Sequence, residues 1–151
     1  MKGRIITNAD CTERIAVVYR AVISIRSATV DDVAEVLAFW AEATVEPSAT
    51  DDPDSVVALL RAAPGALLLA VDDDGATSTI VGTVIASWDG WRGAMYRLAV
   101  SPSMRRQGIA TRLVTEGERR VREQGARRFH LIVLEEEAPA QAFWTAVGYE
   151  H

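Results

Sequence analysis

The sequence has little cysteine, lysine or histidine: one cysteine, one lysine and two histidines in 151 residues. Cys11 has no partner for an internal disulfide, which is typical of proteins kept in a reducing compartment. The longest apolar runs, such as 66–71, are far shorter than the roughly 20 residues that cross a membrane. No basic segment leads into an apolar run at the start, as a secretory signal would require. We therefore expect a soluble, cytoplasmic protein without a metal site.

Length and composition favour one globular domain. A chain of 16.4 kDa with 49% hydrophobic and 25% charged residues is neither disordered nor membrane-embedded. A chain of this size buries roughly 68–70% of its unfolded surface, so it needs no disulfide to build a core. We interpret residues 1–21 as an N-terminal extension and 22–151 as a single domain.

The charge is unevenly distributed along the chain. The net charge is −5, but residues 105–128 hold eight arginines and three glutamates and carry +5, so the remainder carries −10. A basic segment in an acidic protein indicates either a bound anion or a solvated helix face, and both interpretations stay open. An acidic chain is not expected to bind nucleic acid or a membrane surface.

Hydrophobic periodicity predicts a mixture of strands and helices. Strands are predicted over 22–26, 66–71, 80–88, 94–100 and 129–134, and helices over 29–43, 53–63, 108–124 and 139–147. This order predicts an α+β (α/β) domain with helices packed on a mainly antiparallel sheet.

The most informative stretch joins the strand at 94–100 to the long helix at 108–124 through Arg105-Arg-Gln-Gly108. Unpaired amides and the helix dipole make a helix start an anion site. Gly108 leaves room for a phosphate at the backbone, Ala110 keeps the first turn open, and arginine suits phosphate oxygens. The loop therefore predicts a phosphate site, although many ordinary helices also begin after an Arg-Gly turn.

The loop also carries a family signature. Arg105-Arg-Gln-Gly-Ile-Ala110 matches the Arg/Gln-x-x-Gly-x-Gly/Ala pattern of the GCN5-related N-acetyltransferases (GNAT), after the Leu-Ala-Val-x-Pro strand end that they usually show. Ile25-Arg-x-Ala-x-x-x-Asp32 looks like their opening strand and first helix, and Ala140-x-x-Phe-Trp-x-x-x-Gly-Tyr149 looks like their closing helix. The chain thus resembles this family from about residue 22 to 149, in the family's order and spacing.

The resemblance implies a GNAT-type fold, with a mixed, mostly antiparallel twisted sheet and helices on both faces. It also implies a V-shaped splay between the two central strands and a binding cleft for acetyl-CoA there. The backbone of Leu98 and Val100 would pair with the pantetheine arm, and amides from Arg106 to Thr111 would hold the pyrophosphate. The residues assigned to acetyl-CoA in this way are Leu98, Ala99, Val100, Arg105, Arg106, Gln107, Gly108, Ile109, Ala110, Thr111 and Trp144. The implied reaction is direct acetyl transfer to a primary amine of a small molecule or peptide, without a covalent enzyme intermediate.

The catalytic positions depart from the family pattern. Trp144 stands where many relatives have a tyrosine that protonates the thiolate, and an indole N–H is no practical acid. Glu137 replaces a frequent asparagine, and Ile132 replaces a glutamate base. We predict that Asp89 receives the amine's proton and that Tyr96 acts as the acid. The alternatives are a turn residue for Asp89 and a buried aromatic anchor for Tyr96.

Two other functions remain possible from the sequence. A catalytically silent acyl-CoA-binding module would explain the missing tyrosine and base. A nucleotide-binding regulatory domain would use the same loop, but the loop in this sequence lacks a Lys-Ser/Thr pair after the glycine.

Trp40, Trp88 and Trp91 line either the acceptor pocket or the core and its rim.

The chain ends at His151, where relatives usually continue into a final strand. We expect that strand to be absent, which would leave an open sheet edge. The strand-like segments at 4–7 and 15–19 would then supply a replacement, within one chain or across a homodimer. The alternative is a truncated chain with a disordered leader.

Overall fold

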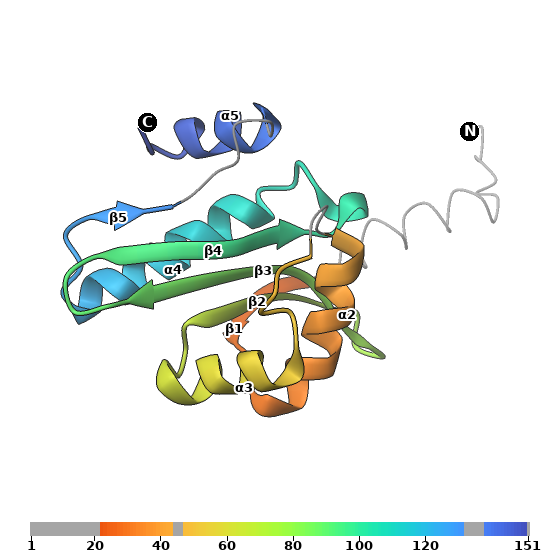
Figure 1. Ribbon diagram of the computed structural model, residues 1–151. Coiled ribbons are helices and arrows are strands. Elements are labelled where there is room, and N and C mark those ends of the chain that lie inside the picture. Colours follow the sequence, from red (N-terminus) through yellow and green to blue (C-terminus); the bar gives the residue numbers. More distant parts are fainter. Residues whose placement is uncertain (1–21, 44–46, 132–137, 151) are drawn as a thin grey trace, which may run out of the picture.

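The computed structural model describes residues 22–43, 47–131 and 138–150 (Figure 1). A five-stranded sheet has the order β1-β2-β3-β4-β5, in which β1 to β4 are antiparallel and β5 runs parallel to β4. The strands are β1 (Val22–Ser27), β2 (Leu67–Asp73), β3 (Ser78–Trp88), β4 (Gly93–Val100) and β5 (Phe129–His130). The helices are η1 (Val30–Asp32), α2 (Val33–Ala43), α3 (Pro53–Ala62), η2 (Pro102–Met104), α4 (Ile109–Gln124) and α5 (Ala138–Ala146). The α+β prediction is confirmed.

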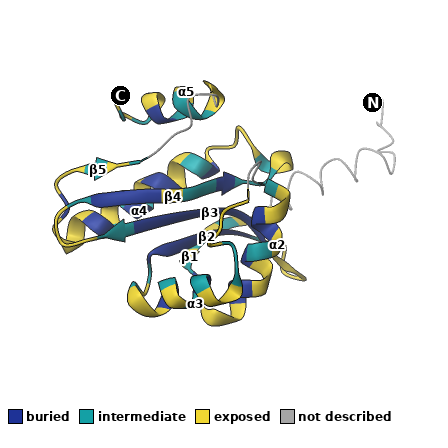
Figure 2. Cartoon of the chain, viewed as in Figure 1, coloured by how far each residue is buried: buried dark blue, intermediate teal, exposed yellow. Residues whose placement is uncertain are grey.

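Helices cover both faces of the sheet, as the family resemblance implies. Side chains of a strand alternate between its faces. In β2, Leu67, Leu69 and Val71 pack with α2 and α3, whereas Leu68 and Ala70 pack against α4. Figure 2 shows the central strands buried between these two helical layers. The continuous apolar run of β2 is therefore a strand buried on both sides.

The first helix begins at a charged cluster. The carboxylate of Asp32 accepts the backbone N–H of Thr29 at 2.8 Å and two guanidinium N–H groups of Arg26 at 2.8 and 2.7 Å. These bonds, above all those from Arg26, lower the pKa of Asp32 from 3.8 to about 2. The predicted helix over 29–43 accordingly starts as the single turn η1 before continuing as α2.

The predicted strand over 129–134 is only partly observed. The structure places Phe129–His130 in β5 and leaves Leu131 outside any element, while 132–137, which include Ile132 and Glu137, lie outside the described residues. The predicted extension at 1–21 also lies outside them, so its strand pieces and the homodimer stay predictions. No helix in the described part is long and apolar enough to cross a membrane.

Candidate active site

In the described residues, β4 and β5 pair at their first two positions. Gly93 lies opposite Phe129 and Ala94 opposite His130, whereas β4 continues to Val100 and β5 ends at His130 (Figure 1). Gly93 is required at this junction, because a Cβ there would lie 2.5 Å from the Phe129 ring. The described pairing of β4 with β5 therefore ends at Ala94, which agrees with the V-shaped splay of the expected fold, and we call this point the opening of the splay.

A bulge interrupts β4 where the splay opens. Ala99 pairs with Thr83, but Tyr96 pairs with Ile85, so β4 has one residue more than β3 in this interval. Arg97 absorbs the extra residue with a φ of +51°, in the left-handed region. Such a bulge bends a strand and reverses its alternation. The bulge at Arg97 thus lies three residues beyond the last described pair between β4 and β5.

A chain of buried hydrogen bonds holds this bulge. The indole N–H of Trp40 donates to the Thr83 hydroxyl at 2.9 Å, and that hydroxyl donates to the Arg97 carbonyl at 2.9 Å. Thr83 is 0% exposed and Trp40 is 2% exposed. The Arg97 guanidinium lies 5.3 Å from the Trp40 ring and forms an ion pair with Asp51. Trp40 is thus a buried support and does not line an open acceptor pocket.

The sequence interpretation missed Thr83 and Asp51. A threonine inside the apolar run of β3 is compatible with any strand, and Asp51 looks like another residue before a helix. The available signal was Arg97, a charge in an otherwise apolar strand, which must find a partner when it is largely buried. The partner lies 46 residues away in sequence, so no local pattern reveals it.

The second half of β4 presents backbone groups toward the splay. The Ser101 N–H donates to the Val81 carbonyl of β3 at 2.8 Å. Because backbone groups alternate along a strand, those of Val100 and Leu98 point to the other edge. The Arg105 side chain donates to the Val100 carbonyl on that edge at 3.3 Å. This edge matches the pairing surface that the resemblance implies, whereas the intervening Ala99 is buried.

The loop before α4 forms an open cradle of amides. Arg106 and Gly108 have left-handed φ values of +63° and +78°. The amides at 109–111 precede the first intrahelical bond, which runs from the Arg112 N–H to the Gly108 carbonyl. A Cβ on Gly108 would meet no atom within 4 Å. Within the described chain, neither Arg106 nor its neighbour Arg105 forms an ion pair with a carboxylate. Open amides beside uncompensated cations fit a phosphate group.

The side chains of this cradle divide between core and solvent. Gln107 and Thr111 are exposed, and Ala110 is half-buried. Ile109 is buried with Leu113 under the sheet, so it anchors the start of α4 and offers only its amide to a ligand.

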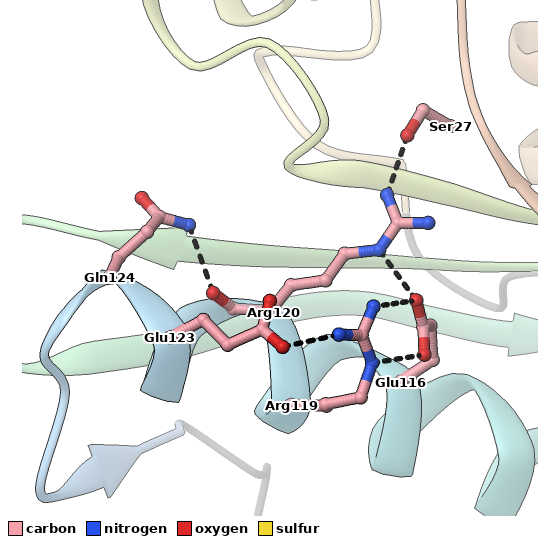
Figure 3. Close-up of polar contacts among 6 residues, drawn as sticks. All are labelled: Ser27, Glu116, Arg119, Arg120, Glu123 and Gln124. Atoms are coloured by element: carbon pink, nitrogen blue, oxygen red, sulfur yellow. Dashed lines mark hydrogen bonds and ion pairs between the residues drawn. The ribbon is translucent and has the colours of Figure 1, made fainter.

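Along the middle of α4, the arginines of the basic segment are paired with glutamates. Figure 3 shows Arg119 and Arg120 converging on Glu116, with Arg119 also reaching Glu123 and Arg120 reaching Ser27 of β1. Hydrogen bonds from Arg119 and then Arg120 lower the pKa of Glu116 from 4.5 to about 2. The solvated-face interpretation therefore holds along the middle of α4, and the predicted anion has to be sought at its ends.

Tyr96 lies beside the opening of the splay. It is two residues past the last β4–β5 pair and is 48% exposed, so the alternative of a buried anchor does not describe it. Trp144 of α5 is buried next to the edge of β4, in one cluster with Leu98 and Val100. Its ring makes an edge contact with Tyr149 at 5.2 Å between centroids.

Tyr149 fastens α5 to α4. Its hydroxyl donates to a carboxylate oxygen of Glu118 at 2.7 Å. Burial, and then this bond, raise the pKa of Tyr149 above its usual 10. The hydroxyl is therefore a structural donor that keeps Trp144 in place beside β4.

Asp89 is placed in the turn between β3 and β4. Its Oδ1 accepts the backbone N–H groups of Trp91 and Arg92 at 2.8 and 2.7 Å. These bonds, that from Arg92 first, lower the pKa of Asp89. The turn lies at the end of β4 that begins with Gly93, opposite the cradle. This geometry corresponds to the turn-residue alternative, not to a base beside the splay.

Comparison with known proteins identifies the family. The model of the acetyltransferase (GNAT) family matches residues 33–149, and the chain belongs to this family. The fold is shared with PaiA N-acetyltransferase from Thermoplasma acidophilum in complex with coenzyme A, at 15% identity and a TM-score of 0.74, over 85% of this chain and 90% of that one.

Two further structures share the fold. The NatC complex bound to Gag peptide and CoA matches at 20% identity and a TM-score of 0.75, over 85% of this chain and 84% of that one. The aminoglycoside N-acetyltransferase AAC(6')-Iy, bound to a CoA bisubstrate analogue, matches at 18% identity and a TM-score of 0.69, over 87% of this chain and 92% of that one.

Proposed function

We propose that this chain is an acetyl-CoA-dependent N-acetyltransferase that moves an acetyl group directly to a primary amine of a small molecule or peptide. The observation that carries the proposal is that the edge of β4 leads directly into the amide cradle before α4. The edge of β4 that points away from β3 has no strand partner beyond Ala94 in the described residues, and it runs through Leu98 and Val100 into the amide cradle of Arg106 and Gly108. An extended chain ending in phosphates, which is the shape of CoA, matches this surface. Neighbours of the same fold that contain CoA support the proposal.

Each part of the donor has residues suited to it. Backbone groups of Leu98 and Val100 bind the amides of the pantetheine arm, with Trp144 packed beside them. The amides from 106 to 111 bind the pyrophosphate, since unpaired amides at a helix start favour negative charge. Arg105 exchanges its bond with the Val100 carbonyl for a phosphate oxygen at the rim.

The acceptor chemistry needs a neutral amine, a polarised carbonyl and a proton for the departing thiolate. Acetyl-CoA supplies the activated acetyl group when bound. Tyr96, half-exposed beside the opening of the splay, is the hydroxyl that we assign to protonating the thiolate. Arg97, held by Thr83 and Asp51, keeps the bulge and hence the donor edge in position. Asp89 is engaged in its turn and has no role in this proposal.

A panel of amines tests the proposal. The purified chain is incubated with acetyl-CoA and polyamines, aminoglycosides, amino acids or peptides, and free thiol and acetylated nitrogen are measured. We expect both products, in equal amounts, with at least one acceptor class.

The second candidate is a silent acyl-CoA-binding module, which the indole of Trp144 favours because it is no acid. CoA binding by calorimetry without turnover of any amine would establish this module instead. Binding of ATP in place of CoA would favour the nucleotide-binding alternative.

A further inference from the structure

Seven arginines of the described chain have no carboxylate partner, and five of them gather in two places. Of the other two, Arg61 lies apart on α3, and Arg112 donates to the Ile23 carbonyl at 2.9 Å. Carboxylates neutralise five arginines of the described chain: Arg26, Arg97, Arg119, Arg120 and Arg122. Arg105 and Arg106 have no such partner and lie at the cradle before α4. The second group consists of Arg92, Arg127 and Arg128, which the proposed function does not use. In the described residues, none of these three forms an ion pair with a carboxylate.

These three arginines line one pocket with two tryptophans. The pocket has a volume of about 400 Å³ and lies between the β3–β4 turn and the connection from α4 to β5. Its lining residues, which we call the arginine–tryptophan pocket, are Trp88, Gly90, Trp91, Arg92, Gly125, Arg127 and Arg128. Its volume falls in the range of small-molecule sites.

The aromatic part of the pocket is open and held in place. Trp91 is 72% exposed, an unusual state for so large an apolar side chain. The Arg92 guanidinium lies 4.2 Å from the centre of its ring. Asp89 accepts the backbone N–H groups of both residues and so fixes the turn that carries them. The Asp89 carboxylate offsets one of the three positive charges, and an excess of two remains.

The pocket is separate from the proposed donor site. β4 starts at Gly93, beside the pocket, and ends at Val100, beside the cradle, whereas α4 runs back from the cradle to Gln124. Its 16 residues span about 24 Å at 1.5 Å each. One ligand group therefore cannot contact both groups of arginines at once. The inference does not depend on the proposed function.

We propose that the arginine–tryptophan pocket binds a planar aromatic anion, with its ring on Trp91 and its carboxylate or phosphate on Arg127 and Arg128. Tryptophan offers a face for stacking, and arginine pairs in two-bond geometry with either anionic group. A nucleotide and an aromatic carboxylate share this chemistry, and the experiment separates them.

Calorimetry with four probes tests the combination of ring and charge. Adenosine monophosphate and naphthoate carry both, adenosine carries only the ring, and inorganic phosphate carries only the charge. We expect adenosine monophosphate, naphthoate or both to bind at least tenfold more tightly than adenosine or inorganic phosphate does. The tighter binder of the two shows whether the pocket prefers a nucleotide or an aromatic carboxylate. Equal or absent binding of all four probes overturns the proposal.

The four indole N–H resonances of the isotope-labelled chain locate the ligand. Those of Trp88 and Trp91 shift on binding, whereas those of the buried Trp40 and Trp144 stay in place. Binding that is lost in Gly108→Glu, or that shifts only the buried indoles, places the anion elsewhere and overturns the proposal.

Matched charge deletions complete the test. Arg127→Ala and Arg128→Ala each weaken binding at least threefold. Arg61→Ala removes the same charge from an exposed position on α3 and leaves the affinity unchanged. An equal loss in all three variants means that the ligand senses only net charge, which contradicts a built pocket.

Discussion

Replacing Gly108 by glutamate perturbs the proposed pyrophosphate cradle most directly. Gly108 has a φ of +78° and open space around the position of a Cβ. A glutamate there places a negative charge and a side chain over the amides that are proposed to bind phosphate. We expect Gly108→Glu to fold and to lose most of its affinity for CoA.

The glutamate substitution affects both the stability of the fold and the affinity for CoA, and the two effects have separate physical causes. An L side chain in the left-handed region costs about 1–2 kcal/mol, which lowers Tm by about 2–8 °C in a chain of this size. A like charge at about 4 Å costs about 1 kcal/mol in water and about 4 kcal/mol at an effective dielectric constant of about 20. Since about 1.4 kcal/mol is tenfold in affinity, we expect CoA to bind about fivefold to several hundredfold more weakly.

Two variants separate strain from charge. Gly108→Ala introduces the backbone strain alone and should weaken CoA binding much less than glutamate does. Gly90→Glu introduces the same charge at a φ of +93° with equally open surroundings, but at the other end of β4. Calorimetry gives the affinities and thermal unfolding gives Tm. The assignment of the cradle would be refuted if a folded Gly108→Glu variant bound CoA as tightly as the unchanged chain does. It would also be refuted if Gly108→Glu and Gly90→Glu bound CoA with the same affinity.

Three further outcomes are expected. Thr83→Val removes the buried hydroxyl that accepts the Trp40 indole N–H and donates to the Arg97 carbonyl, so urea unfolding should show a loss of about 2–4 kcal/mol in the free energy of unfolding. Thr83→Ser keeps a hydroxyl and should lose much less, and an equal loss in both variants would contradict the role of these hydrogen bonds. The pKa of Asp32 is lowered from 3.8 to about 2 in the folded state, so its contribution to stability is complete above about pH 4 and is lost as the pH falls toward 2. The free energy of unfolding of Asp32→Asn should therefore fall less steeply between pH 4 and pH 2, and an equally steep fall in the variant would contradict this account. If Tyr96 is the acid, Tyr96→Phe should lower kcat by about 10²-fold or more and leave the affinity for acetyl-CoA unchanged. Full activity in this variant would show that Tyr96 is not the acid.

The elements that the sequence predicts correctly are those with strong local signals. The apolar run at 66–71 has to be buried on both faces, and it becomes β2 between two helical layers. Asp52 before Pro53 marks the start of α3, and its carboxylate accepts the Ser55 N–H at 2.9 Å. Gly108 marks the start of α4, where the backbone requires a left-handed conformation.

The features that escape the sequence depend on long-range contacts. A bulge inserts one residue, and nothing in the run 94–100 distinguishes a straight strand from a bent one until Arg97 finds its partners. The support of that bulge joins Trp40 to Thr83, 43 residues apart. The pairing of arginines is likewise set by the fold, so the basic segment at 105–128 separates into a neutralised middle and free ends only in three dimensions.

Asp89 shows the limit of assigning roles by position alone. Its place after a strand is compatible with both a base and a turn residue, and only the bonds from Trp91 and Arg92 distinguish them. Tyr96 illustrates the opposite case, because an aromatic residue within an apolar strand usually indicates burial, yet this one is half-exposed. In the described residues, Tyr96 lies two positions beyond the last pair with β5 and directly before the bulge at Arg97, which agrees with its exposure.

Amide hydrogen exchange with and without CoA tests the proposed donor site most directly. Binding should slow exchange at the amides of Leu98, Val100 and 106–111, while α3, on the other face of the sheet, keeps its rates (Figure 1). Slower exchange confined to these amides is the predicted result. Bound CoA that leaves them unprotected, or protects another part of the chain instead, would contradict the proposed site.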